Sequence, residues 1–245
     1  MKARSSRVAF PARLASLAVI LSATTAALSG QQAPGGRVTF LPAGLDVVAL
    51  LPFAGSDSLP QEREIRAQFD FLLGASLAAR RFTVRGGTPA LRAWLRVRDS
   101  LGGFYDRKTG RRLEGKVGPA ARAALAATGA ELLLVPELHV VDVWIANRKA
   151  EWDGVERSTN LVLGGRTQAL SLVAELRDSS GALVTTLRSG FTMLTRPKND
   201  RLVPATRAEV FADQKRMREC TDRLADSMPG VPRKPPLEKE QRAIP

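Results

Sequence analysis

Cysteine and histidine are nearly absent from this sequence. Its 245 residues hold one cysteine, Cys220, and one histidine, His139. A single cysteine excludes a disulfide within the chain, so the stability must come from a packed core. Cys220 falls among the apolar positions of an expected helix. This favours burial of its thiol over pairing with a second chain, which is the alternative.

The scarcity of histidine also restricts the chemistry. A zinc site built on His139 would need carboxylates or Cys220 to complete it, and the sequence has no cluster with ligand spacing. A Ser-His-Asp triad would need His139 as its base, but no serine stands in a Gly-x-Ser-x-Gly turn. We therefore expect His139 to be an ordinary strand residue that faces solvent or a loop.

No cofactor is expected. The segment 110–116 matches the Gly-x4-Gly-Lys part of a phosphate-binding loop, but Val117 stands where Ser or Thr would hold magnesium. Glu137 and Asp142 are five residues apart on an expected strand, hence on opposite faces. Only Glu151 and Asp153 leave an enzymatic alternative, an exported hydrolase. The main expectation is a protein that is not an enzyme.

The sequence also lacks a long, strongly apolar run. Its uncharged stretch 14–28 is too short and too rich in Ala, Ser and Thr to span a membrane comfortably. Small residues follow at Ala27 and Ser29, and four basic residues precede or begin the stretch: Lys2, Arg4, Arg7 and Arg13. This pattern predicts a cleaved signal peptide over 1–29, with an uncleaved amphipathic anchor as the alternative. No cysteine lies near the cleavage region, so a lipid anchor is not expected.

The charge balance must be corrected for this segment. The formal net charge is +13, and removing the four basic residues leaves 33 basic against 24 acidic residues, a net charge of +9. A basic protein of this kind suits an anionic partner. Export argues against nucleic acid, and the charges are dispersed. We expect mostly a solvated surface, with an anionic envelope polymer as an alternative partner.

A domain over residues 45–228 follows a short leader, 30–44. The apolar run 47–53 predicts a buried strand, and a helix with one apolar stripe leads to a second strand at 82–84. Ser58 and Gln61 have the spacing of a helix cap. These elements predict a β-α-β unit.

The rest of the domain should add helices and long strands. Helices are expected at 89–100, from Pro119 to a glycine end at Gly129, and from the Thr206–Glu209 capping box to 228. Strands are expected at 132–146, bulged or at an edge at Pro136, and at 168–177 and 183–194. The fold class is α/β, a single domain with a mixed sheet that starts as β-α-β and ends as an antiparallel meander, and with helices on its faces. The tail 229–245 is expected to be disordered.

Two polar inserts carry the candidate binding residues. The first, 101–118, is expected to form a hairpin or protruding loop with basic and aromatic side chains, the means by which an anionic polymer is held. The second, 148–165, is expected to be a loop pinned by one tryptophan. The tentative partner-binding residues are Tyr105, Arg107, Arg111 and Arg112 in the first insert and Trp152 and Asp153 in the second.

Four segments, spread over residues 45–195, resemble the TolB N-terminal-like domains. They are the first strand 47–53, the Arg-Phe-Thr-Val strand 81–84, the helix end and strand 126–135, and the Asp-Ser-Ser-Gly turn 178–181. The family includes curli-secretion proteins and activators of peptidoglycan synthases. In this sequence neither a lipobox nor a β-propeller accompanies the pattern. The inserts 101–118 and 148–165 have no counterpart in the TolB N-terminal-like domains.

The resemblance implies an envelope protein that binds other proteins without catalysis. The leading expectation is an exported protein, periplasmic or associated with the outer membrane. It would act as a binding or assembly domain with an envelope protein as partner, and a homo-oligomer is a further option. A domain that binds an anionic polymer and an exported hydrolase are the alternatives.

Overall fold

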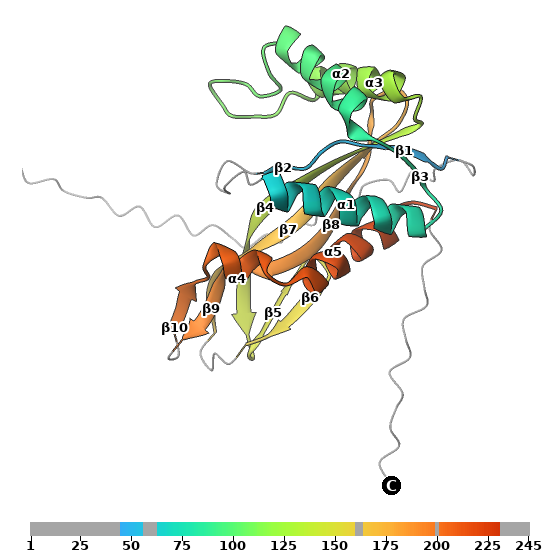
Figure 1. Cartoon of the computed structure of the whole chain (residues 1–245). Coiled ribbons are helices and arrows are strands. Elements are labelled where there is room, and N and C mark those ends of the chain that lie inside the picture. The colour runs from blue at the N-terminus through green and yellow to red at the C-terminus, as the bar shows by residue number, and fades with distance from the viewer. Residues whose placement is uncertain (1–44, 56–62, 160–163, 199–200, 231–245) are drawn as a thin grey trace, which may run out of the picture. The chain divides into compact units, whose positions relative to one another are not determined.

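The computed structural model describes residues 45–55, 63–159, 164–198 and 201–230. The expected signal peptide, the leader, the Ser58–Gln61 cap and nearly all of the expected tail lie outside these residues. The described chain forms an eight-stranded mixed sheet with helices on its faces, together with a separate two-stranded sheet (Figure 1). The expected α/β fold class is confirmed.

The chain begins with the expected β-α-β unit. Strand β1 (Val47–Leu50) and strand β3 (Thr83–Arg85) are parallel, and helix α1 (Arg63–Ala79) connects them. A two-residue strand, β2 (Ala54–Gly55), follows β1. The stripe of α1 is buried in the main core: Phe69, Leu72, Leu73 and Leu77, with Ile65 partly buried. The apolar period of α1 therefore fixes which of its sides meets the sheet.

Two helices form the layer on the other face of the sheet. Helix α2 (Gly87–Ser100) and helix α3 (Glu114–Thr128) pack on each other, and Ala120, Ala121 and Ala124 of α3 are fully buried. Gly129 ends α3 in a left-handed conformation, as its position predicts.

The expected start of α3 at Pro119 was wrong. The helix begins at Glu114, and Pro119 lies inside it. An interior proline removes one helical hydrogen bond. The first turn forms nonetheless because Lys116 donates a backbone hydrogen bond to Leu113, and because Glu114 pairs with the buried Arg177. That ion pair joins segments far apart in the sequence, where no local pattern reveals it.

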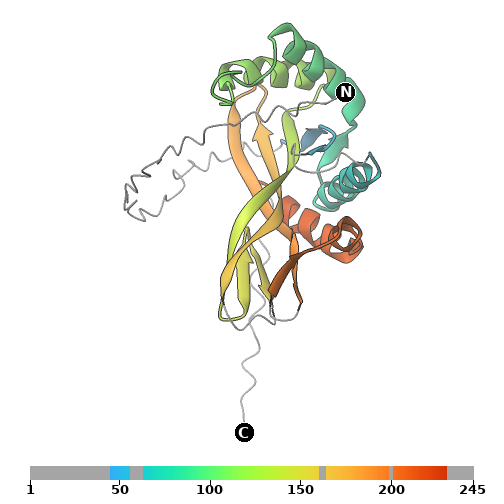
Figure 2. The same ribbon diagram turned by 90° about the vertical axis from the view of Figure 1, so that its left-hand side faces the viewer.

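Three long antiparallel strands form the centre of the sheet: β4 (Leu132–Ala146), β7 (Gly165–Arg177) and β8 (Leu183–Met193). They twist strongly along their length (Figure 2). The turn at 178–181 joins β7 to β8, as predicted, and Asp178 Oδ1 accepts hydrogen bonds from Ser180 N and Ala182 N. The first half of β4 also pairs in parallel with β1.

Pro136 causes neither a bulge in the β4–β7 ladder nor an edge. Pro136 pairs with Ala174 of β7 in regular register. On the other side of β4, the parallel ladder is interrupted between the pairs Leu50–Leu134 and Ala54–Glu137. Leu51 N donates to the Leu134 carbonyl, and residues two apart on a strand turn their backbone groups to the same side. Pro136, which has no N–H, therefore lies where the next hydrogen bond on this side of β4 would form.

The second insert forms a hairpin rather than the expected loop. Strands β5 (Lys149–Trp152) and β6 (Val155–Ser158) are joined by Asp153 and Gly154, both at positive φ. Two positive-φ residues define a turn that suits the twist of a two-stranded ribbon. A further hairpin, β9 (Thr195–Lys198) and β10 (Arg201–Pro204), was not predicted.

The last helix is divided in two. The Thr206–Glu209 capping box starts α4 (Arg207–Phe211), as predicted, but Asp213 caps a second helix, α5 (Gln214–Asp226). The apolar side predicted for this whole segment is buried against the main core: Val210, Met217, Thr221, Leu224 and Met228.

Cys220 is fully buried on α5, as expected, and its thiol contacts the Ser189 carbonyl at 3.4 Å. Burial raises the pKa of this thiol to about 11. The thiol is therefore protonated at neutral pH.

The two faces of the sheet carry separate cores. Helices α1 and α5 cover one face, and α2 and α3 cover the other at the end where β1 pairs with β4. Toward the far end of β4, the β5–β6 hairpin covers that second face with Ala150, Trp152 and Val155. The strip of β4 between these two covers holds the polar residues Glu137 and His139. No helix among the described residues is long and apolar enough to span a membrane.

Candidate functional site

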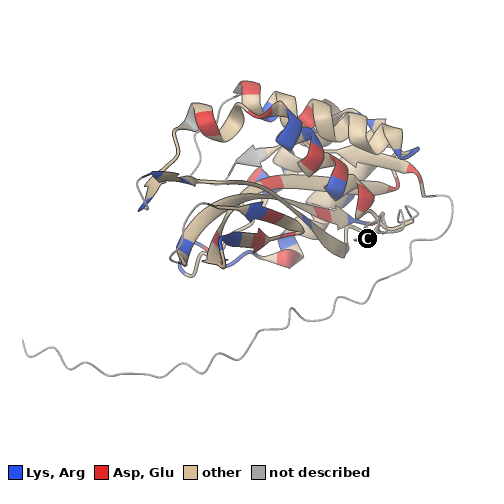
Figure 3. Ribbon diagram, turned by 90° about the horizontal axis from the view of Figure 1, so that it is seen from below, with Lys and Arg blue, Asp and Glu red and all other residues tan. Residues whose placement is uncertain are grey.

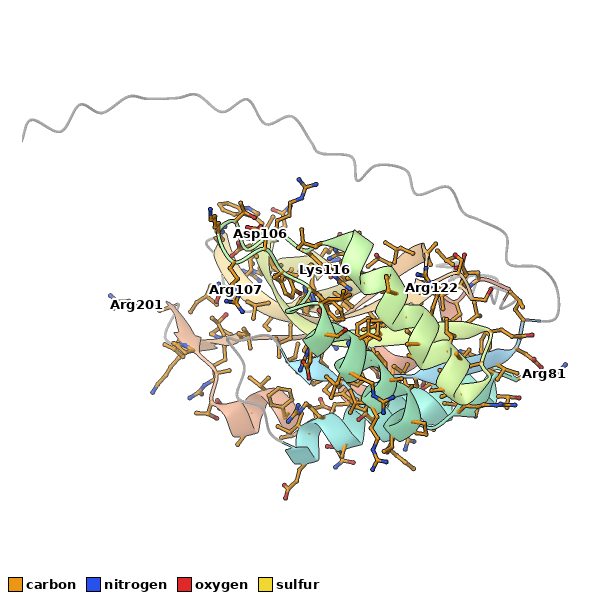
Figure 4. The ribbon with its side chains drawn as sticks, turned by 90° about the horizontal axis from the view of Figure 1, so that it is seen from above. Arg81, Asp106, Arg107, Lys116, Arg122 and Arg201 are labelled. Carbon is orange, nitrogen blue, oxygen red and sulfur yellow. The ribbon has the colours of Figure 1, made fainter. Side chains whose placement is uncertain are left out.

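The first insert contains a well-ordered hairpin, residues 103–112. Tyr105 and Arg112 face each other as a β-bridge, and Asp106 N donates to the Arg111 carbonyl at 2.8 Å. The Asp106 carboxylate accepts hydrogen bonds from Thr109 N at 2.8 Å and Lys108 N at 3.0 Å. The bond from Thr109 N is the main reason that the pKa of Asp106 is lowered. The hairpin predicted from the sequence is confirmed, and it projects beside α2 (Figure 4).

Apolar packing and ion pairs attach this hairpin to the domain. The Phe104 ring is buried edge-on against Trp94 of α2, with 5.0 Å between ring centroids. Arg112 makes a two-pronged ion pair with Glu175 of β7, with Nη2 to Oε2 at 2.7 Å. The hairpin is thus held at both ends before any ligand arrives.

Arg177, which is 1% exposed, extends this ion-pair chain. Its Nη2 lies 2.8 Å from Glu175 Oε2 and 2.8 Å from Glu114 Oε2. Burial acts to lower the pKa of Arg177, but the hydrogen bonds to both carboxylates raise it overall. Hairpin, α3 and β7 are therefore joined through one buried guanidinium.

A cleft of about 920 Å³ lies between this hairpin, α2 and the sheet. It opens beyond the carboxyl end of β1, the edge at which ligands bind in open α/β sheets. Its volume is typical of small-molecule sites. Its lining includes Leu51, Arg66, Leu91, Trp94, Leu95, Arg98, Phe104, Tyr105, Arg112, Val135, Glu137 and His139.

Glu137 and His139 lie side by side on the cleft face of β4. Their side chains meet through Glu137 Oε2 and His139 Nε2 at 2.9 Å. This hydrogen bond is the largest cause of the lowered pKa of Glu137, burial opposes it, and the charge of Arg112 adds to it. Glu137 is therefore a carboxylate at neutral pH. His139 lies on a strand and is part-exposed, as expected, but it faces the cleft.

The β5–β6 hairpin does not line this cleft. Trp152 is buried, and its Nε1 donates to the Leu170 carbonyl at 3.2 Å. Asp153 Oδ2 accepts from Ser171 Oγ at 2.5 Å, and the Asp153 carbonyl accepts from Gly190 N at 2.8 Å. These bonds attach the hairpin tip to β7 and β8.

The six residues proposed from the sequence therefore fall into two groups. Tyr105 and Arg112 line the cleft, while Arg107 and Arg111 are exposed on the hairpin beside it. Trp152 and Asp153 belong to the other hairpin. The two hairpins contact β7 at Glu175 and at Ser171, about 13 Å apart along the strand. They do not form one site.

Sequence reasoning missed four polar residues of the cleft. Arg66 on α1, Arg98 on α2, and Glu137 and His139 on β4 come together only through the tertiary fold. The Glu137-x-His139 spacing was the one available signal, because residues two apart share a face of a strand. Among the described residues, no group of three or more His, Cys, Asp or Glu side chains could hold a metal ion.

Charges of both signs are otherwise interspersed over the helices and strands (Figure 3). The hairpin tip differs, since Arg107, Lys108 and Arg111 form no ion pair with any carboxylate in the described parts of the chain. Asp106, the acidic residue beside them, is occupied by the turn itself.

No family model and no curated protein matches this chain. Among solved structures, a neuraminyllactose-binding hemagglutinin homolog from Helicobacter pylori matches 74% of this chain and 82% of its own. The identity is 11% and the TM-score is 0.33. No functional inference follows from a likeness at this level.

Proposed function

We propose that this protein is an exported, non-catalytic binding domain of the cell envelope, and that its partner engages the cleft between α2 and the 103–112 hairpin. The observation that carries the proposal is the cleft itself, at the carboxyl end of β1 and walled by a hairpin that ion pairs and ring packing attach to the domain. Preorganised walls reduce the entropy lost on binding.

The pairing of the cleft's ionisable groups fixes the side chains that a partner would meet. Glu137 and His139 bond to each other, and Arg112 bonds to Glu175. The TolB-like order of elements and the export signal in the sequence favour the proposed function. Asp153, which the hydrolase alternative pairs with Glu151, accepts a hydrogen bond from Ser171 that attaches the hairpin to β7.

Site-specific cross-linking tests this proposal. A photoreactive amino acid is placed at Tyr105, which is 53% exposed at the cleft, and in a matched variant at Trp144, which is 65% exposed on the far half of β4. Both variants are produced with the export segment in the source cells. We expect one discrete adduct from position 105 and none from position 144. Absence of an adduct at 105, or equal adducts from both positions, would contradict the proposal.

The unpaired tip residues favour one second candidate, an anionic envelope polymer. Such binding weakens steeply with salt. It should also fall in the double variant Arg107→Gln, Arg111→Gln, with Arg92→Gln on α2 as the exposed control. Arg112 is unsuited to this test because its charge is already paired with Glu175. Polymer affinity that changes neither with salt concentration nor in the double variant would contradict this candidate.

A further inference from the structure

The lining of the cleft includes apolar side chains on its floor and on its α2 side. Leu51 and Val135 are buried in its floor, at 3% and 7% exposure, and Leu91 and Leu95 are half-buried along its α2 side. Trp94 and Phe104 pack on each other, are less than 10% exposed, and add further apolar surface to the lining. This lining suits a hydrocarbon body.

The charged lining is unequal in sign. Three guanidinium groups, from Arg66, Arg98 and Arg112, reach the cleft from three different elements, against the single carboxylate of Glu137. Glu137 in turn is bonded to His139. Two of the guanidinium groups are already paired, Arg112 with Glu175 and Arg98 with Asp99, so an anionic group is accommodated where it replaces one of these carboxylates.

Arg98 is the guanidinium best placed to receive such a group. Arg112 uses both Nη atoms on Glu175 and so builds the wall. Arg98 uses Nε and Nη2 on its neighbour Asp99, and both side chains are largely exposed, at 43% and 66%. Exposed ion pairs of this kind contribute little and are readily exchanged for another acceptor.

We propose that the cleft binds an anionic amphiphile, with its hydrocarbon body against Leu51, Leu95 and Val135 and its phosphate or carboxylate at Arg98. The planar guanidinium suits either oxyanion. The inference rests on the proposed function, since it names the chemistry of the ligand for the same cleft.

Three probes separate the parts of this ligand. Dodecyl phosphate carries both body and charge, dodecyl maltoside carries the body alone, and inorganic phosphate carries the charge alone. Each is titrated calorimetrically into the full-length protein below its micelle-forming concentration. We expect dodecyl phosphate to bind at least about tenfold more tightly than either of the others, as one charge-assisted hydrogen-bonded contact implies.

Two variants locate the binding. Arg98→Gln should weaken dodecyl phosphate about tenfold, while Arg96→Gln, an exposed position on the same helix outside the cleft, should not. Leu95→Trp should block the hydrocarbon site. Thermal unfolding of each variant confirms that the fold is retained. Equal binding of dodecyl maltoside, absence of binding by dodecyl phosphate, or equal effects of Arg96→Gln and Arg98→Gln would overturn the proposal.

Vesicles containing an anionic phospholipid distinguish the source of the amphiphile. Vesicle binding that Arg98→Gln and Leu95→Trp abolish supports a membrane lipid, and binding of the free amphiphile alone supports a soluble ligand. Vesicle binding indifferent to both variants would overturn the inference. If the Tyr105 cross-linker captures a partner while dodecyl phosphate fails to bind, the proposed function stands and this inference fails.

Discussion

The two polar inserts look alike in sequence and become different devices in the fold. Both are rich in charge and glycine, and both form hairpins that lie on the same face of β7. The 103–112 hairpin keeps its tip in solvent and walls a cleft. The β5–β6 hairpin turns its tip against β7 and β8 and covers a core. Similar composition therefore did not imply similar function.

Tyr105 and Trp152 differ in exposure in the same way as the tips of their hairpins. Tyr105 lies at the mouth of the cleft and is 53% exposed, whereas Trp152 is 9% exposed and packs against Gly190. A Cβ at Gly190 would lie 2.8 Å from Trp152 Nε1, so only glycine lets the indole approach β8 this closely. Matched substitutions in the two hairpins should therefore have different effects on the stability of the fold.

The largest expected effect is the loss of the Trp152 side chain. Trp152→Ala should lower the free energy of unfolding by about 3–5 kcal/mol, because a buried indole and its hydrogen bond to Leu170 are removed. Tyr105→Ala, the matched change in the other hairpin, should alter it by less than about 0.5 kcal/mol. Denaturant unfolding measures both values.

The rate of thiol labelling at Cys220 provides a second measurement on the variants Trp152→Ala and Tyr105→Ala. The Cys220 thiol, with a pKa of about 11, lies beside Ser189 under α5 and should resist a thiol reagent at pH 8 in the native protein. Labelling should accelerate in Trp152→Ala and stay slow in Tyr105→Ala. Equal unfolding free energies and equal labelling rates for the two variants would refute the contrast.

An intermediate effect is expected at the base of the cleft hairpin. Glu175→Gln removes a charge shared by Arg112 and the buried Arg177, and should cost about 3 kcal/mol of unfolding free energy, since a buried cation loses a partner but keeps Glu114. Glu156→Gln breaks an exposed pair with Lys149 in the other hairpin and should cost less than about 1 kcal/mol. If both changes prove equally mild, the ion-pair chain does not hold the hairpin.

These residues also show how far sequence reasoning extends. The apolar periods predicted α1 and the long strands, and local signals predicted the end of α3 at Gly129 and the start of α4 at Thr206, because each depends on neighbours in the chain. The strand 168–177 was predicted, but the ion pairs of its Glu175 and Arg177 were not, since their partners Arg112 and Glu114 are 63 residues away. The cleft was missed for the same reason.

The smallest effect concerns the tip of the cleft hairpin and depends on pH. Asp106 has a lowered pKa in the folded state, so its carboxylate supports the turn fully above the ordinary aspartate value of about 3.9 and loses that role as pH falls through the lower, folded value. Hydrogen exchange at the Thr109 amide, compared with its intrinsic rate, should therefore stay constant from neutral pH to about pH 4 and accelerate below it. Asp106→Asn should remove this acid dependence. Loss of protection well above pH 4 would mean that the turn depends on a group other than Asp106.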